Sequence, residues 1–197
     1  MTYRLYNADT LNRYAKDCHD RAVAKGFWDE PYSVGHYLML AFGELHEGIE
    51  ADRIGKWAKL TPEQIEELRD LKGAAFAQAF LRMVKDTVED EIADAVIRLL
   101  DLLGYFIDRY GLPDWKVNYG IELYGEDGIP HMLTDALMPI VTDLCIADEK
   151  CDPTMGLLNS IKSLELLCDH LGIDLMAHID LKLKYNATRP ALHGKKY

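Results

Sequence analysis

Apolar positions along the chain repeat at helical spacing, and strand-like alternation is nearly absent. One clear stripe consists of Val34, Leu38, Ala41, Phe42, Leu45 and Ile49. This spacing puts the side chains on one face of a helix, which buries that face against the rest of the protein. Comparable patterns predict helices over residues 10–25, 34–57, 61–73, 86–110, 130–147, 153–171 and 174–187. The sequence therefore predicts an all-α fold.

Capping residues mark the start of several helices. Asp9 or Thr10 is the expected cap of the first helix, and Ser33 that of the second. Thr61 is followed by a proline at the first helical position and by acids in the first turn. Residues 74–86 either continue that helix or form a loop. Residues 114–129 predict a loop, in which VNYGIELYG alternates weakly and could form a short strand.

The length and the charge of the chain limit the number of domains it can form and the kinds of partner it can bind. We expect one domain over residues 1–197. A net charge of −11 argues against nucleic acid or an anionic membrane as a partner. No run of eighteen apolar residues predicts a membrane span, and the N-terminus lacks the apolar core of a signal peptide. The four cysteines, which form no CxxC pair, are expected to be reduced thiols in a cytoplasmic protein.

The helix expected over residues 86–110 combines an apolar surface with one polar stripe. Twelve of the sixteen residues from 92 to 107 are apolar. Glu91, Asp94, Arg98 and Asp101 nevertheless recur at spacings of three and four, which aligns them on one face. Buried carboxylates are costly unless they are paired or bound to a metal. The stripe therefore either faces solvent, with Arg98 neutralising its neighbours, or forms part of a site.

A second acidic pair favours the site. Glu44 and Glu47 lie at about −100° and −160° from Leu45 around the 34–57 helix, on one flank of its apolar stripe. When that stripe docks on the core, the flank faces a neighbouring helix. Two helices that each contribute an i, i+3 acidic pair form an all-oxygen site, which Mg²⁺ or Mn²⁺ prefers. Each pair alone is a weak signal, since Glu63 and Glu66 show the same spacing on an expected surface.

Four segments in order resemble the MazG-like, all-α nucleoside triphosphate pyrophosphohydrolases, which are related to the dimeric dUTPases. FGELHEGIEA and VEDEIADAVIRLLDLLG match the two acidic helices of that family. GFWDEPYS resembles its tryptophan-containing entry segment, and LGIDLMAHIDLKLKYNATRPALHGKKY resembles its closing helix and tail. The resemblance implies a helical bundle of the all-α NTP pyrophosphohydrolase type.

The resemblance also implies an activity and the residues that perform it. Glu44, Glu47, Glu91 and Asp94 would be the catalytic residues and would bind Mg²⁺, for which Mn²⁺ could substitute. The metal would activate a water that cleaves a nucleoside triphosphate to a monophosphate and pyrophosphate. Glu47 is the expected residue to orient that water.

The same resemblance implies how the substrate is held. Lys184, Asn186 and Arg189 match the positions in the family that contact phosphate. Without the resemblance, the stretch KYNATR is better explained as a helix end with basic residues that complement the helix dipole. Trp28 would stack on the nucleobase, or else fasten its loop to the helical core.

Two departures from the family pattern concern the substrate more than the metal chemistry. The interval between Glu47 and Glu91 is longer than is usual for the family. Residues at about 105–164 form an extra helical insertion, which could add a lid, alter the substrate pocket or build an oligomer interface. The resemblance implies a homodimer or homotetramer.

Other functions compete with the enzyme. A non-catalytic helical oligomer or regulatory module could bind a nucleotide without cleaving it. A ferritin-like di-iron protein requires Glu-x-x-His pairs, which the sequence lacks. His19 and Asp20 superficially resemble the start of an HD phosphohydrolase motif, but no second histidine and distal aspartate follow at the required spacing. On the sequence alone, the enzyme is the favoured interpretation.

Overall fold

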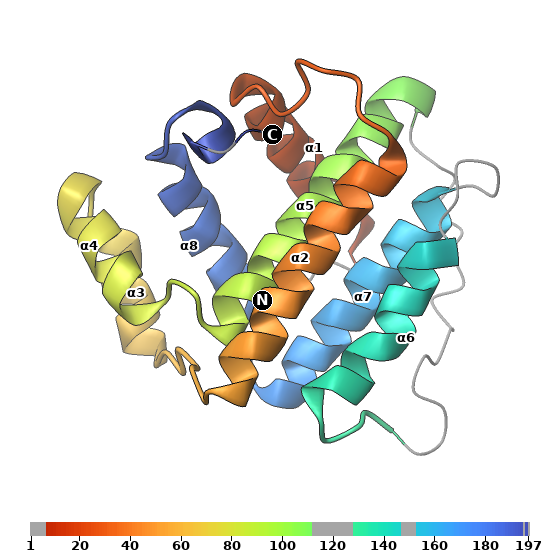
Figure 1. The fold of residues 1–197 in the computed structure, drawn as a ribbon. Helices are drawn as coiled ribbons and strands as arrows, with labels where there is room; N and C mark the ends of the chain where they lie inside the picture. The colour runs from red at the N-terminus through yellow and green to blue at the C-terminus, as the bar shows by residue number, and fades with distance from the viewer. Residues whose placement is uncertain (1–6, 112–127, 147–152, 195, 197) are drawn as a thin grey trace.

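The described part of the chain is a bundle of α-helices, and no strand occurs in it (Figure 1). The computed structural model describes residues 7–111, 128–146, 153–194 and 196. The helices are α1 (Ala8–Ala24), α2 (Val34–Arg53), α3 (Pro62–Asp70), α4 (Gly73–Met83), α5 (Val88–Tyr110), α6 (Leu133–Ile146), α7 (Pro153–Leu171) and α8 (Leu175–Ala187), followed by a short 3₁₀ helix, Ala191–Gly194. The prediction of an all-α fold is confirmed.

Side-chain caps set several helix starts, and one of them differs from the prediction. Asn7, rather than Asp9 or Thr10, caps α1, because its side chain accepts hydrogen bonds from the Asp9 and Thr10 amides. Ser33 caps α2 as expected, and Thr61 forms a reciprocal capping box with Gln64.

The region between the two acidic helices consists of further helical elements. Residues 73–83, which the pattern left undecided, form a separate helix, α4. Asp86 has a left-handed backbone (φ 60°), and Thr87 then caps α5 through the Asp90 amide. Helix α5 therefore begins at Val88 rather than at Asp86. Helix α2 ends at Arg53, one turn before the expected end near Trp57.

Helix α5 is the centre of the bundle. Helices α1, α2, α7 and α8 pack against it (Figure 1), and most of its apolar side chains are fully buried. Gly104 allows the closest approach of α1, since a Cβ there would lie 2.4 Å from the carbonyl oxygen of Ala15 and 2.6 Å from Cβ of His19. Helices α3 and α4 form a smaller apolar cluster with α8.

The helices in the region that the resemblance marks as an insertion contribute to the main core. Helices α6 and α7 pack on each other, α7 on α5, and α6 on α2. Leu137, Ile140, Leu157 and Leu164 are among their side chains in the main apolar cluster. The weakly alternating segment VNYGIELYG lies outside the described residues.

The cysteines and the helices were also the subject of predictions. Cys18, Cys145 and Cys168 are free thiols, as expected, and Cys151 lies outside the described residues. Among the described helices, none combines the length and the apolar character that crossing a bilayer requires.

Candidate metal centre and adjoining cavity

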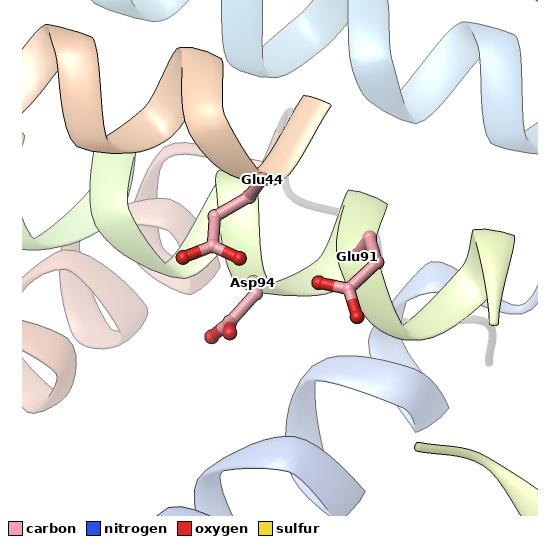
Figure 2. A group of neighbouring side chains, drawn as sticks. All are labelled: Glu44, Glu91 and Asp94. Carbon is pink, nitrogen blue, oxygen red and sulfur yellow. The ribbon is translucent and has the colours of Figure 1, made fainter. Parts of the chain in front are cut away.

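Three carboxylates from two helices converge near the N-terminal end of α5. Glu44 projects from α2, while Glu91 and Asp94 project from α5 (Figure 2). Each offers one carboxylate oxygen that lies within 4.8 Å of the other two. This is the convergence that the two acidic pairs predicted, with three of the four side chains brought together.

Glu44 is buried and paired with an arginine. Only 5% of the residue is exposed, and Nε of Arg98 donates a hydrogen bond to its Oε1 at 2.7 Å. Burial and the neighbouring Asp94 raise the pKa of Glu44, and the charge of Arg98 opposes that rise without cancelling it.

Asp94 is paired with a lysine that is itself buried. Nζ of Lys182, a residue 1% exposed, lies 3.1 Å from Oδ2 of Asp94 and 2.7 Å from Oδ1 of Asp90. Burial alone would raise the pKa of Asp94. Lys182 and Arg98 outweigh burial, so this pKa lies below its usual value.

Glu91 is buried without a hydrogen bond. The residue is 2% exposed, and neither of its carboxylate oxygens has a hydrogen-bond partner among the described residues. Its nearest ion pair is long, since Nζ of Lys85 lies 3.6 Å from Oε1. Burial raises the pKa of Glu91 to about 8, despite the opposing charges of Lys182 and Lys85. Glu91 is thus a buried acid with no hydrogen-bond donor among the described residues and with lysine charges that do not offset its burial.

Glu47 lies outside the three-carboxylate cluster. The residue is exposed and lines a surface hollow together with Glu44 and Arg98. Gly48 occupies the flank of α2 that faces α5, since a Cβ on it would lie 3.6 Å from Cβ of Glu91. Glu47 is thus turned past the interface to the edge of the site.

The polar stripe of α5 faces the interior of the bundle rather than open solvent. The exposed side-chain fractions are 2% for Glu91, 16% for Asp94, 22% for Arg98 and 15% for Asp101. The last three also line a cavity of about 250 Å³ that begins beside the carboxylates. The solvent-facing interpretation of the stripe is therefore wrong.

Four helices and the loop after α1 line this cavity. Its basic residues are Arg21, Lys25, Arg98 and Arg189, and its aromatic residues include Phe27, Tyr32 and Tyr37. Lys25 donates hydrogen bonds from Nζ to the carbonyl oxygens of Ala187 and Arg189, which joins the ends of α1 and α8. No described residue of α6 or α7 is among the lining residues.

The residues predicted to bind substrate have different surroundings. Asn186 and Arg189 line the cavity, and Oδ1 of Asn186 is buried without a hydrogen-bond partner among the described residues. Lys184 instead donates to the carbonyl oxygens of Leu68, Arg69 and Leu71, at the end of α3. The structure therefore brings two of these three residues to the cavity.

Trp28 is packed beneath the cavity. Its ring stacks on Tyr37 (centroids 4.2 Å apart) and on Tyr105 (4.6 Å), against the main apolar cluster. Its Nε1 donates to Oδ1 of Asp101 at 2.9 Å, and Nδ1 of His19 lies 2.8 Å from the same oxygen. This arrangement matches the alternative in which Trp28 fastens its loop to the core.

Sequence reasoning missed the buried partners of the carboxylates. Lys182 stands between two leucines in the middle of the helix expected over residues 174–187, and its pattern does not distinguish it from a surface lysine. Asp90 is adjacent to Glu91 in sequence, but its role depends on Lys182. His19 is joined to Asp101 across 82 positions, a contact that only the packing of α1 on α5 creates.

Comparisons with protein-family models, with curated proteins and with solved structures returned no match to this chain. Its function is therefore argued from the site, and the MazG-like assignment stays a prediction from sequence motifs.

Proposed function

We propose that the protein is a Mg²⁺-dependent nucleoside triphosphate pyrophosphohydrolase, which cleaves a nucleoside triphosphate to a monophosphate and pyrophosphate. The observation that carries this proposal is the state of Glu91. Its two buried oxygens have no hydrogen bond among the described residues, and they lie beside two further carboxylates.

The residues around Glu91 suit a divalent cation. Glu44, Glu91 and Asp94 supply only oxygen ligands, which Mg²⁺ and Mn²⁺ prefer. With Asp90 included, four acidic side chains meet three basic ones, Lys85, Arg98 and Lys182. If all four acids were ionised, one negative charge would be left over. Without a metal, the raised pKa of Glu91 keeps this residue protonated near pH 7, and a bound cation would take the place of that proton. Mg²⁺ bound to these carboxylates would neutralise phosphate charge and lower the pKa of a bound water.

The chain's own residues would orient the substrate. Arg98 lines both the cavity and the surface hollow that contains Glu44 and Glu47. It would therefore lie between a nucleoside bound in the cavity and the metal-binding carboxylates. A guanidinium in this place can bind two phosphate oxygens at once. Arg189 would hold the phosphates from the α8 side. Glu47, at the edge of the hollow, would accept a hydrogen bond from the attacking water and so orient it.

One observation favours a second function, a module that binds a nucleotide without cleaving it. Arg98 and Lys182 already pair with Glu44 and Asp94, and an ion-pair network of this kind needs no metal. In that case nucleotides would bind equally well with and without Mg²⁺, and none would be hydrolysed.

The test is an assay of the purified chain against the eight common nucleoside and deoxynucleoside triphosphates. Products are separated by anion-exchange chromatography, with Mg²⁺ and with EDTA. We expect monophosphate and pyrophosphate in equal amounts from at least one substrate, with Mg²⁺ alone. Glu44→Gln should abolish this turnover, whereas Glu50→Gln, an exposed change on the same helix, should retain it. Release of orthophosphate and a diphosphate, or turnover in EDTA, would refute the proposed reaction.

A further inference from the structure

The cavity beside the metal centre has a further, partly buried carboxylate at its other end, Asp101. Asp94 and Asp101 both line the cavity and lie on α5 seven residues apart. Seven residues are two helical turns, so the two side chains share a face and are about 10.5 Å apart along the axis. Arg98 lies between them on the same face. Along α5 the cavity therefore presents a metal-binding end, a cation and an isolated acceptor.

One oxygen of Asp101 is fully engaged with the protein. Oδ1 accepts a hydrogen bond from Nε1 of Trp28 at 2.9 Å and lies 2.8 Å from Nδ1 of His19. These contacts fix the orientation of the carboxylate. No hydrogen bond from a described donor reaches Oδ2, and 15% of the side chain remains exposed at the cavity. Oδ2 is thus an acceptor held in a fixed position.

The walls around this acceptor suit a planar ring. Tyr37, Leu40 and Ile97 line the cavity near α2 and α5, and Phe27 and Tyr32 come from the loop that joins α1 to α2. Apolar and aromatic walls with a few placed polar groups are typical of pockets that orient a small ligand by specific hydrogen bonds.

We propose that Asp101 selects nucleotides whose base carries an exocyclic amino group, as cytosine and adenine do. An amino N–H donates to Oδ2. An oxo group at the same position, as in uracil or hypoxanthine, would place its lone pairs against a carboxylate that cannot turn away. This inference deepens the proposed function, since it names the substrate class of that site.

Binding of monophosphates tests the selection without hydrolysis. Isothermal titration calorimetry in EDTA compares CMP with UMP and AMP with IMP, pairs that differ by an amino and an oxo group. A hydrogen bond to a charged group changes affinity by about 10- to 100-fold. We expect the amino member of at least one pair to bind more tightly by a factor in this range. Equal affinities within both pairs, or no binding of any of the four, would overturn the inference.

A substitution connects the preference to Asp101. Asp101→Asn keeps an acceptor for Trp28 and His19 but replaces Oδ2 with an amide donor, so the preference should disappear or reverse toward the oxo base. Asp108→Asn, an exposed change on the same helix, should leave it unchanged. Circular dichroism checks that the Asp101→Asn protein is folded. If it is not folded, the comparison of CMP with UMP and of AMP with IMP on the unmodified protein still decides whether the site selects an amino group.

The two proposals fail in different ways. Amino-selective binding without any triphosphate cleavage would refute the hydrolase and retain the selection by Asp101. Mg²⁺-dependent cleavage without a preference between CTP and UTP or between ATP and ITP would refute the selection and retain the hydrolase.

Discussion

Two buried glutamates in the first turn of α5 differ in their hydrogen-bond partners. Glu89 is 3% exposed and Glu91 2%. The Glu89 carboxylate accepts backbone hydrogen bonds from Ala58 at 2.8 Å and from Lys59 at 2.9 Å. The Glu91 carboxylate accepts none from the described residues. Burial alone thus says little about function. What distinguishes the two acids is whether folding supplies partners, and the unpartnered one lies with Glu44 and Asp94.

Exchanging each acid for its amide is the strongest way to break this contrast. Glu91→Gln should lower pyrophosphohydrolase turnover by at least ~1,000-fold, because it removes a metal ligand. It should also abolish any stabilisation that Mg²⁺ gives in thermal melts. Glu89→Gln should destabilise the fold by about 1–3 kcal/mol through its backbone partners, and retain the response to Mg²⁺. A Glu91→Gln protein with full turnover would remove Glu91 from the site.

Two lysines on α8 extend the contrast to cations. Lys182 is buried between Asp90 and Asp94, while Lys184 binds three carbonyl oxygens at the end of α3. Lys182→Met removes the closest cation from both Asp90 and Asp94 and should cost about 3–5 kcal/mol in the free energy of unfolding. Lys184→Met should cost only about 1 kcal/mol, since water can replace it at partly exposed carbonyls. Urea denaturation measures both, and equal losses would contradict the assignment.

The pH dependence of stability sharpens the contrast further. The pKa of Glu91 is raised to about 8 in the folded protein, against an ordinary value near 4.5. The folded state therefore binds more protons than the unfolded state between these values, so this residue makes stability fall as pH rises from about 4.5 to 8. The fall due to Glu91 should be on the order of 5 kcal/mol in EDTA, since each pKa unit corresponds to about 1.4 kcal/mol. It should be absent in Glu91→Gln, when urea denaturation curves of the two proteins are compared at each pH.

The sequence predicts most of the helices, because most of them carry their own signal; α4, which the pattern left undecided, is the exception. Apolar periodicity marks α2 and α5, and Ser33 and Thr61 mark helix starts. The convergence of Glu44, Glu91 and Asp94 could also be predicted, since spacing fixes which side chains share a face. Glu47 shows the limit of that reasoning. Its angular position is only about 60° from that of Glu44, yet this difference places it at the edge of the site.

Contacts between distant helices could not be predicted. The pairing of Lys182 with Asp94 depends on how α8 is rotated against α5, and nothing local in either helix specifies that rotation. The same holds for His19 and Asp101. For Lys184 the sequence suggested one partner and the structure gives it another. A basic residue near a helix end matched a phosphate-binding position, but the nearby carbonyls of α3 are its partners in the structure.

Gly104, in the second half of α5, has a consequence for the proposed selection of the base by Asp101. Because no side chain separates Gly104 from Ala15 and His19, the two backbones approach closely enough for an imidazole on α1 to reach the Asp101 carboxylate. An alanine at this position would wedge α1 outward and withdraw that imidazole. Discrimination between bases would then depend on glycine, rather than alanine, at position 104, several turns along α5 from the metal-binding carboxylates.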